Sequence, residues 1–447
     1  MAIDSEIFHA YDVRGIYPKE INEDAVYKIA QAYIKIFNPA RAIVLGKDVR
    51  LSSPSLWQAA AKGINDAGCD VIDIGTISTD MLYFAVAHYD YGGGLTISAS
   101  HNPGEYNGIK FVRENSVAVS ADTGLVDIKD EVLKNEQIME PEKGEITKKE
   151  IIDDYVRHCL SFIDVKSLKS MKIVANANFG MAGIVLKKIL ADLPIEIVPL
   201  NFEPDGNFPK GRPDPMIPAN RQETETLVKS SAATLGVAWD ADADRCFIFD
   251  EHGEYVDGYY LTAILAEYFL KKNPGEKIIS DPRLIWAIKD TVLGNKGIYL
   301  VNKPGHAFIK DRLRAENAIF AGETSGHFYF RDNFFCDNGM IPFLIVLEIL
   351  NKADIKMSEL VKPYRNKYFI SGEINKKVKD PDKILKAAEK KYKDGKVEFV
   401  DGLSVEYSDW RFNLRKSNTE PLIRLNVEAK SQELVDEKTE ELLAIIK

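Results

Sequence analysis

The sequence has few cysteines and no long apolar segment. Its four cysteines, among 447 residues, lie far apart and show no Cys-x-x-Cys spacing of the kind found in zinc sites. No apolar run approaches the roughly 20 residues of a membrane-spanning helix, and the N-terminal MAIDSEIFHAYD lacks the parts of a secretion signal. These absences argue against a disulfide framework, a zinc site and a membrane partner, and they predict a cytoplasmic protein with reduced thiols.

Clustered positive charge is also missing. The chain has 68 Asp and Glu against 58 Lys and Arg, which gives a formal net charge of −10. Without a run of Lys and Arg, the sequence lacks the footprint of a nucleic-acid-binding protein, so no nucleic acid is expected as a partner. An acidic protein that handles an anionic substrate has to place a few cations locally. Isolated cations beside glycines are therefore candidates for substrate binding.

Short apolar runs alternate with glycine-containing turns and helix-length amphipathic stretches. The pattern begins at 42–46, at 172–180 and at 277–281, and each time a second apolar run follows the amphipathic stretch. A strand, a helix and a parallel strand produce this pattern, and such units build α/β layers. Because the three units recur at roughly 100-residue spacing, they predict a repeated domain of similar topology.

The C-terminal part differs from the rest. KYFISGEINKKV and RFNLRKSNTEPLIRLNVEA are typical of antiparallel strands, and SQELVDEKTEELLAII is typical of a closing amphipathic helix. Charged segments at 131–150 and 351–369 are interpreted as connections between domains. The sequence predicts three similar α/β domains with mixed sheets, at 1–148, 149–252 and 253–364, and a smaller α+β domain at 365–447.

Three aspartates, Asp240, Asp242 and Asp244, alternate in the stretch WDADADR. Carboxylates this close repel one another unless a cation neutralises them, and a hard divalent ion such as Mg²⁺ prefers oxygen ligands. An EF-hand is a rival because Glu251 falls at its twelfth loop position, but the sixth position holds Arg245 instead of glycine. The stretch predicts a magnesium site, with a solvated acidic turn as the alternative.

A serine and a histidine lie side by side in TISASHNPGEYNGIKF. Ser100 and His101 precede an Asn-Pro turn, with glycines on both sides and Lys110 further on. The pair fits a nucleophile with its base, an anion-binding turn or a plain loop. These residues alone do not distinguish the three.

The stretch FAGETSGHFYF carries Glu323, Ser325 and His327 among glycines. This composition suits a loop that hydrogen-bonds the hydroxyls of a polar ligand. A glycine-rich turn with a satisfied histidine would look the same.

The stretch RKSNTEPLIR places Ser417, Asn418 and Thr419 beside Arg415. Small donors around one guanidinium group are what a phosphate monoester site needs. The alternative is a capped corner between a strand and a helix.

Smaller pieces supply further local cations. AYDVRG places Tyr11 and Arg14 before a glycine, and LGKDVRLSS places Lys47 and Arg50 before serines. KPGHAFIK places His306 after a glycine. Each piece alone is more typical of a turn or a surface ion pair than of a site.

Taken in this order, ASHNP, DADADR, GETSGH and RKSNTEP resemble the α-D-phosphohexomutases, in particular the phosphomannomutase/phosphoglucomutase group. The resemblance runs from AYDVRG to SNTEP and so covers essentially the whole chain. It implies a four-domain, heart-shaped enzyme with its active site in a central cleft, to which each domain gives one loop. It also implies an intramolecular phosphotransferase that interconverts hexose 1-phosphate and hexose 6-phosphate, with one Mg²⁺ per chain and hexose 1,6-bisphosphate as intermediate and activator.

The resemblance assigns roles to residues of every motif. They are the phosphoserine Ser100, which also faces the metal; the magnesium ligands Asp240, Asp242 and Asp244; the catalytic Arg14, Lys110, His306 and His327; the substrate-binding Tyr11, Arg245, Glu323, Ser325 and His327; and the phosphate-binding Arg415, Ser417, Asn418 and Thr419. The general base is left open among Lys110, His306 and His327. One departure is that alanines stand in DADADR where the family usually has glycines, which should only stiffen the loop.

A phosphoserine would explain the hydroxyl at position 100, since it stores a phosphoryl group for an acceptor. The phosphoryl group would pass to a hexose phosphate, and the resulting bisphosphate would turn around and return its other phosphate. The alternatives are a phosphoglucosamine mutase, whose phosphate loop usually reads SGTEP, and a metal-dependent serine phosphatase, which would usually need histidine ligands near the aspartates. Asn418 in place of that glycine favours mannose and glucose phosphates, whereas the preferred sugar and the oligomeric state stay open.

Overall fold

The computed structural model describes residues 3–134, 140, 142–416 and 422–446. The chain forms two compact units, Met1–Tyr255 with His327–Lys356 and Val256–Gly326 with Met357–Lys447. The predicted third domain is divided between the two units, so the four predicted domain boundaries remain predictions.

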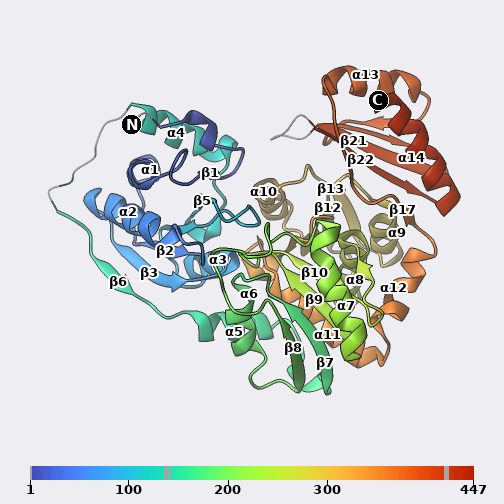
Figure 1. Cartoon of the computed structure of the whole chain (residues 1–447), viewed down its shortest axis with the longest axis horizontal. Coiled ribbons are helices and arrows are strands. Elements are labelled where there is room, and N and C mark those ends of the chain that lie inside the picture. Colours follow the sequence, from blue (N-terminus) through green and yellow to red (C-terminus); the bar gives the residue numbers. More distant parts are fainter. Residues whose placement is uncertain (1–2, 135–139, 141, 417–421, 447) are drawn as a thin grey trace. The chain divides into compact units, whose positions relative to one another are not determined.

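The first unit begins with a mixed sheet of order β1-β5-β4-β2-β3-β6. Strand β2 is parallel to β3 and to β4, whereas β5 is antiparallel to β1 and to β4. The predicted strand at 42–46 is confirmed as β2, and its parallel partner is β3 (Figure 1). The elements are β1 (Val13–Ile16), α1 (Glu23–Phe37), β2 (Ile43–Lys47), α2 (Ser53–Asp66), β3 (Val71–Thr76), α3 (Thr79–His88), β4 (Gly93–Ile97), β5 (Tyr106–Arg113), α4 (Leu125–Leu133) and β6 (Ile146–Lys148).

Helix α1 shows how the sequence sets the core of this sheet. Asn22 caps the helix because its side chain accepts a hydrogen bond from the Ala25 amide at 3.0 Å. Val26, Ile29 and Tyr33 recur at helical spacing, and all three are fully buried. The apolar stripe therefore faces the sheet and leaves the polar side of α1 to solvent.

The second sheet of the first unit has the order β10-β9-β7-β8, with the short β11 (Tyr255–Val256) beside β10 where the unit ends. Strands β8 and β9 are parallel to β7, and β10 is antiparallel to β9. The predicted strand at 172–180 is confirmed as β7. The other elements of this unit are α5 (Ile152–Leu160), β7 (Met171–Asn176), α6 (Ala182–Ile189), β8 (Ile195–Leu200), α7 (Gln222–Ser231), β9 (Leu235–Trp239), β10 (Cys246–Phe249), β15 (Phe328–Phe330), β16 (Cys336–Asp337) and α11 (Met340–Ala353).

The second unit starts with three parallel strands in the order β13-β12-β14. The predicted strand at 277–281 is confirmed as β12, with β13 as its parallel partner. The segment 351–369, interpreted above as a connection, contains a helix, α12, because Met357 and Val361 bury an apolar edge one turn apart. The elements are α8 (Gly258–Lys272), β12 (Lys277–Ser280), α9 (Trp286–Gly294), β13 (Ile298–Val301), α10 (His306–Glu316), β14 (Phe320–Gly322) and α12 (Met357–Arg365).

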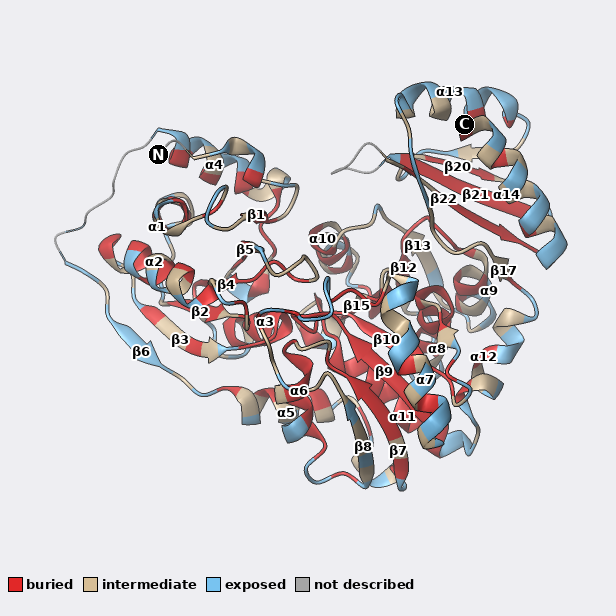
Figure 2. Cartoon of the chain, viewed as in Figure 1, coloured by how far each residue is buried: buried red, intermediate tan, exposed pale blue. Residues whose placement is uncertain are grey.

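The C-terminal part of the second unit is an antiparallel sheet of order β17-β22-β21-β20-β19, with β18 also paired to β22. Figure 2 shows β21 and β22 largely buried, whereas α13 is mostly exposed. The predicted α+β tail is thus confirmed in its strands and in its closing helix. The elements are β17 (Phe369–Ile370), β18 (Ile374–Lys377), α13 (Pro381–Lys391), β19 (Lys396–Glu398), β20 (Leu403–Glu406), β21 (Trp410–Lys416), β22 (Leu422–Ala429) and α14 (Gln432–Ile446).

Two buried ionisable side chains of this C-terminal sheet bind the segment that leads into α9. Arg411 donates hydrogen bonds to the carbonyl oxygens of Pro282 and Arg283, both at 2.8 Å. The Glu428 carboxyl group accepts from the amides of Ile285 and Trp286 at 3.1 and 3.2 Å. Burial raises the pKa of Glu428 to about 8.

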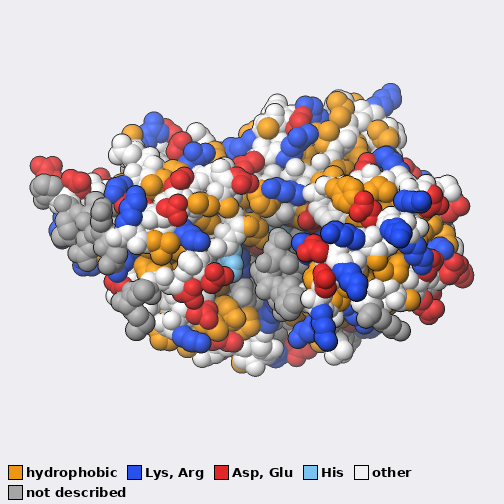
Figure 3. Space-filling view, turned by 90° about the horizontal axis from the view of Figure 1, so that it is seen from above, with side chains coloured by type: hydrophobic (Ala, Val, Ile, Leu, Met, Phe, Trp, Pro, Cys, Tyr) orange, Lys and Arg blue, Asp and Glu red, His pale blue; other side chains and the backbone are white. Residues whose placement is uncertain are grey.

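Six short 3₁₀ helices complete the described structure: η1 (Ser5–Ile7), η2 (Glu114–Ser116), η3 (Ala121–Thr123), η4 (Val165–Ser167), η5 (Pro218–Arg221) and η6 (Arg331–Asn333). Within the described ranges, no helix combines the length and the apolar character needed to cross a membrane. The face seen in Figure 3 carries Lys and Arg interspersed with Asp and Glu.

Candidate active site

Ser100 occupies an unusual turn after β4. Its backbone φ is 49°, in the left-handed region that residues other than glycine seldom adopt. The residue is 3% exposed, and its Oγ lies 3.1 Å from His101 Nδ1 and 3.2 Å from Asp240 Oδ2. Backbone strain of this kind costs about 1–3 kcal/mol and is typical of functional sites. The turn thus holds a buried hydroxyl against the first aspartate of the triad.

Arg50 binds the backbone of the turn that carries Ser100. Its guanidinium group donates hydrogen bonds to the carbonyl oxygens of Ser100, Asn102, Pro103 and Tyr106 at 2.6–3.0 Å. The residue is 1% exposed. The sequence predicts Arg50 as a local cation, but the carbonyl oxygens of the loop already take up the hydrogen-bond donors of its guanidinium group.

Arg14 also binds the turn that carries Ser100. Its Nη1 donates to Asn102 Oδ1 at 2.7 Å and to the Ala99 carbonyl at 3.3 Å, while Nε donates to Asp12 at 2.8 Å. Burial would lower the pKa of Arg14, but Asp12 and the half-buried Tyr11 raise it above its ordinary value. Arg14 thus stays charged beside the Ser100 turn.

The three aspartates lie in the loop between β9 and β10, which is closed by the pairing of Trp239 with Cys246. Asp240, Asp242 and Asp244 are fully buried, and one oxygen of each lies within 4.8 Å of the others. Among the described residues, none donates a hydrogen bond to Asp242 Oδ1 or Asp244 Oδ1. Buried carboxylate oxygens without donors fit a hard divalent cation.

Lys110 supplies a positive charge to this loop. Its Nζ donates to Asp242 Oδ2 at 2.6 Å and to Asp244 Oδ2 at 2.7 Å. Burial alone would lower the pKa of Lys110, but the two carboxylates outweigh it and raise the pKa above its ordinary value. Lys110 is therefore held as an ammonium group.

The aspartates themselves titrate differently. Burial raises the pKa of Asp240 well above its ordinary value, although Arg245 opposes this. Burial and the charge of Asp242 raise the pKa of Asp244 to about 6. Burial acts on Asp242 in the same direction, but Lys110 outweighs it and the pKa of Asp242 is lowered.

Arg245 and His327 extend the site within the same unit. Arg245 Nε donates to Asp240 Oδ2 at 2.7 Å, and the backbones of Arg245 and His327 form an antiparallel bridge. This bridge brings His327 Nε2 to 3.6 Å from Asp244 Oδ1. His327, Asp244 and the buried Asp337 offer a second group of ligand atoms within 4.8 Å of one another.

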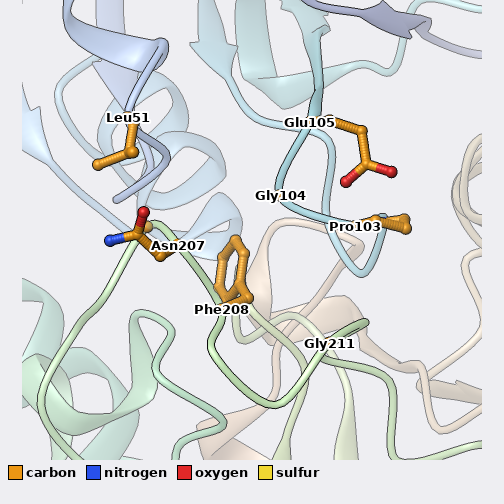
Figure 4. Close-up of a pocket in the computed structure, with 8 residues that line it drawn as sticks. Leu51, Pro103, Gly104, Glu105, Asn207, Phe208 and Gly211 are labelled. Carbon is orange, nitrogen blue, oxygen red and sulfur yellow. The ribbon is translucent and has the colours of Figure 1, made fainter.

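A pocket of about 410 Å³ lies at the turn that follows Ser100. Figure 4 shows Pro103, Glu105 and the Phe208 ring among its lining residues. The Arg50 guanidinium group lies 4.9 Å from the centre of the Phe208 ring, so it links the two loops that form the pocket. None of the predicted site residues that the structure describes lines this pocket.

A second group of predicted residues lies in the second unit. Glu323 is 2% exposed, and its Oε1 accepts a hydrogen bond from the Gly305 amide at 2.9 Å. That bond ties the loop of Glu323 and Ser325 to the N-terminus of α10, where His306 begins the helix and lies 3.4 Å from Lys310. The loop of the predicted sugar-binding residues thus adjoins the N-terminus of α10, where His306 lies.

Arg283, which belongs to none of the sequence motifs, lies beside Glu323. Its Nη2 is 3.6 Å from Glu323 Oε1, and it donates two hydrogen bonds to Asp281 at 2.8 Å. Asp281 also accepts from the Thr324 amide at 2.9 Å. Asp281 directly follows β12 and Arg283 lies two residues further on, and the carboxyl end of a parallel strand is a usual place for ligand-binding groups. That position is the signal by which the sequence could have revealed them.

Arg415 begins the predicted phosphate loop. Its Nη2 lies 2.6 Å from Glu373 Oε2, and its Nη1 lies 3.6 Å from Asp401 Oδ2. Burial and the charge of Arg283 lower the pKa of Arg415. The predicted Ser417, Asn418 and Thr419 lie outside the described residues.

Each unit thus brings together part of the predicted set. In the first unit, Arg14, Ser100, Lys110, Arg245 and His327 lie around the buried loop of Asp240, Asp242 and Asp244, and Tyr11 lies near Arg14. In the second unit, His306 begins α10, Glu323 and Ser325 lie on the loop beside it, and Arg415 lies on β21. The residues of the first unit combine a hydroxyl group, a cluster of carboxylates that can bind a cation, and fixed positive charges. A phosphoryl-transfer enzyme needs these three features.

Comparison with known proteins assigns the chain to a family. Four domain families match in order: phosphoglucomutase/phosphomannomutase α/β/α domains I, II and III over residues 5–139, 153–253 and 257–368, and the C-terminal domain over residues 373–445. A phosphomannomutase of Vibrio cholerae is 45% identical over 453 residues, with 98% of each chain covered.

Solved structures agree with this assignment. A phosphoglucomutase/phosphomannomutase family protein of Burkholderia thailandensis superposes with a TM-score of 0.89 at 32% identity, covering 100% of this chain and 98% of that one. The N-acetylphosphoglucosamine mutase of Aspergillus fumigatus, solved with GlcNAc-6P and magnesium, shares the fold with a TM-score of 0.61 at 13% identity, covering 98% of this chain and 95% of that one. The chain belongs to the phosphoglucomutase/phosphomannomutase family of α-D-phosphohexomutases. It is an intramolecular phosphotransferase that interconverts hexose phosphates.

Proposed function

We propose that the chain interconverts the 1-phosphates and 6-phosphates of mannose and glucose through a phosphorylated Ser100 and a hexose 1,6-bisphosphate. The observation that carries this proposal is the Ser100 turn, whose Oγ lies 3.2 Å from Asp240 beside the acidic loop. A serine hydroxyl is a weak nucleophile, but a phosphoserine is a ready phosphoryl donor. The strained backbone supports a role for Ser100 that a plain loop would not require.

Mg²⁺ fits the acidic loop, and we assign its ligands to Asp240, Asp242 and Asp244 together with the phosphorylated Ser100. The fit rests on the buried Asp242 Oδ1 and Asp244 Oδ1, which have no hydrogen-bond donor in the part of the chain that the structure describes. A bound Mg²⁺ would neutralise charge that develops on the transferring phosphoryl group. A single ion per chain stays a prediction, and the A. fumigatus relative solved with magnesium supports the choice of metal.

The basic side chains around Ser100 have different proposed roles in phosphoryl transfer. Arg14 and Arg245 are fixed by Asp12 and Asp240, so they present positive charge without reorganisation when the phosphoryl group moves. Lys110 stays protonated between two carboxylates, which makes it a poor general base and a poor general acid but a suitable hydrogen-bond donor and electrostatic stabiliser. We therefore favour His327 as the base for the acceptor hydroxyl, since it lies 3.6 Å from Asp244.

The second unit would recognise the substrate. Glu323 and Ser325 would hold sugar hydroxyls, with His306 nearby, and Arg415 would bind the phosphate that does not react. Ser417, Asn418 and Thr419 are assigned to the same phosphate on sequence grounds. One phosphate site of this kind serves both orientations of the bisphosphate.

Mannose and glucose phosphates are preferred over glucosamine phosphate in this proposal. Asn418 stands where phosphoglucosamine mutases usually carry a glycine, and the V. cholerae relative is a phosphomannomutase. The four matched domain families are those of phosphoglucomutases and phosphomannomutases, which favours a mutase over a serine phosphatase. The bisphosphate as activator and a cytoplasmic location remain predictions.

The test is an assay of purified protein on mannose 1-phosphate, glucose 1-phosphate and glucosamine 6-phosphate, each with a trace of bisphosphate. We expect turnover of the first two and a phosphate adduct in intact-mass spectra, and Ser100→Ala should lose both. Near-normal turnover by Ser100→Ala would remove the phosphoserine from the mechanism. If kcat/KM on glucosamine 6-phosphate were higher by tenfold, about 1.4 kcal/mol, the proposed sugar preference would be wrong.

A further inference from the structure

Three guanidinium groups of the second unit converge on one carboxylate, that of Glu373. Arg415 Nη2 lies 2.6 Å from Glu373 Oε2, and Arg424 Nη1 lies 3.4 Å from Oε1. Arg283 Nη1 lies 3.9 Å from Oε2. Glu373 is therefore the anion that this cluster shares.

The sheet itself creates the need for an anion here. Arg415 on β21 and Arg424 on β22 are direct cross-strand partners. Like charges directly opposite each other destabilise a sheet, so a counter-ion has to lie between them. Glu373 supplies that charge from a segment outside the two strands.

The bend that carries Glu373 is fixed to β22. Gly372, with φ of 66°, turns the chain between β17 and β18, and both of these strands pair with β22. The Ser371 hydroxyl accepts a hydrogen bond from the Val427 amide at 2.9 Å, and the Asn426 side chain donates to the Gly372 carbonyl at 3.3 Å. The bend thus delivers one carboxylate to the arginine pair.

Glu373 is also held in its charged form. Burial would raise the pKa of Glu373, but Arg415, Arg283 and Arg424 outweigh it and lower the pKa below its ordinary value. At neutral pH the carboxylate therefore presents two oxygens to the guanidinium groups. A phosphate presents the same kind of oxygen pair to an arginine fork.

We propose that Glu373 is a built-in competitor of the substrate's phosphate group: it occupies Arg415 and Arg424 in the free protein and leaves them when phosphate binds. A phosphate dianion placed on these arginines would be repelled by an ionised carboxylate at 2.6 Å from Arg415. An Arg415 N–H that donates to Glu373 is also not available to the phosphate. The identification of the incoming anion as a sugar phosphate rests on the proposed function.

Such a competitor has a use in a mutase. The bisphosphate has to release one phosphate from this site, turn and place the other there before it can react again. The Glu373 carboxylate neutralises the arginines while one phosphate is exchanged for the other. It therefore lowers the affinity of the site for each phosphate. The cost is a lower affinity for the anion, because part of the binding free energy goes into displacing Glu373.

Calorimetric titration of the whole protein with inorganic phosphate tests the competition. A hydrogen bond to a charged group contributes about 1.5–3 kcal/mol, so we expect Glu373→Gln to bind phosphate about tenfold more tightly or better. The matched control is Asp382→Asn, which removes an exposed carboxylate 2.8 Å from the neighbouring Lys416. The control should stay within about twofold of the wild type, since exposed ion pairs contribute little.

Two further measurements locate the effect and guard against misfolding. The gain should vanish when Glu373→Gln is combined with Arg415→Ala, because the competition takes place at Arg415. Phosphate should also raise the melting temperature of Glu373→Gln more than that of the wild type, even if the variant is less stable without phosphate.

The proposal is overturned if Glu373→Gln binds phosphate as the wild type does or more weakly, which would make Glu373 a positioning residue. It is equally overturned if neither protein binds phosphate or if the gain survives Arg415→Ala. The binding measurement needs no turnover. A protein without mutase activity that still shows the gain would therefore refute the proposed function and leave the competition standing.

Discussion

Replacing Arg50 with lysine should damage both stability and turnover. The guanidinium group of Arg50 serves the carbonyl oxygens of Ser100, Asn102, Pro103 and Tyr106, and its Nε donates to Asp48 at 3.1 Å. A lysine ammonium group keeps the positive charge but has three donors instead of five. It also cannot reproduce the planar fork that reaches several carbonyls at once.

The structure sets the size of the effect. At least two of the five contacts lose their donor, and each buried group left without a partner costs about 1–3 kcal/mol. We therefore expect Arg50→Lys to lower the free energy of unfolding by about 2–6 kcal/mol. Because Arg50 positions the turn of Ser100, we also expect kcat to fall by about 10²-fold, as for a reacting group displaced by about 1 Å.

Urea denaturation and steady-state kinetics measure the two effects, and intact-mass spectra report the phosphorylated fraction. The matched control is Arg41→Lys, since Arg41 pairs with Asp90 at the surface, where both side chains are more than half exposed. The control should change stability by less than about 1 kcal/mol. If Arg50→Lys stayed within about 1 kcal/mol and twofold of the wild type, the turn would not depend on this network.

Two other perturbations follow from the buried carboxyl groups. Asp242→Asn removes a proposed Mg²⁺ ligand, so the rise in melting temperature that we expect on adding Mg²⁺ to chelator-treated protein should be lost; the same rise in the variant would exclude Asp242 as a ligand. Glu428→Gln tests the carboxyl group whose pKa is raised from 4.5 to about 8 in the folded chain. The folded state keeps this proton where the unfolded state has released it, so stability falls as pH rises from about 4.5 to about 8, by up to roughly 3–5 kcal/mol. Melting curves across this range should be flatter for Glu428→Gln, and an unchanged slope would count against the raised pKa.

Much of the fold could be predicted from local sequence. The apolar run IEIVPL became β8 and IYLV became β13 with the boundaries that their residues indicate. Such runs can be recognised because β-branched and other apolar residues favour strands, although β8 and β13 are edge strands that are only partly buried. Helix α12 was missed because only Met357 and Val361 are buried in it and Pro363 lies inside it, so its charged surface dominates the pattern.

The candidate site could be predicted in part for a similar reason. The aspartate triad lies within five consecutive residues, so its electrostatic cost is visible in the sequence. The contact of His327 with Asp244 depends on a backbone bridge to Arg245, more than 80 positions away in the chain. The arginine pair that faces Glu373 depends in the same way on the register of β21 with β22. Neither pairing is visible in any one motif.

The Ser100 turn shows why the serine motif is not sufficient by itself. The left-handed φ of Ser100 costs about 1–3 kcal/mol, and inside ASHNP it is opposed by local contacts such as the hydrogen bond from the Asn102 amide to the Ala99 carbonyl at 3.0 Å. Further compensation comes from Arg50, which binds the carbonyl oxygens of the turn, and from Arg14, which binds the Asn102 side chain. Both arginines lie in other motifs, at least 50 residues earlier in the chain. A chain that kept the serine motif but lost these two arginines would have a hydroxyl in its sequence without the means to hold it against the acidic loop.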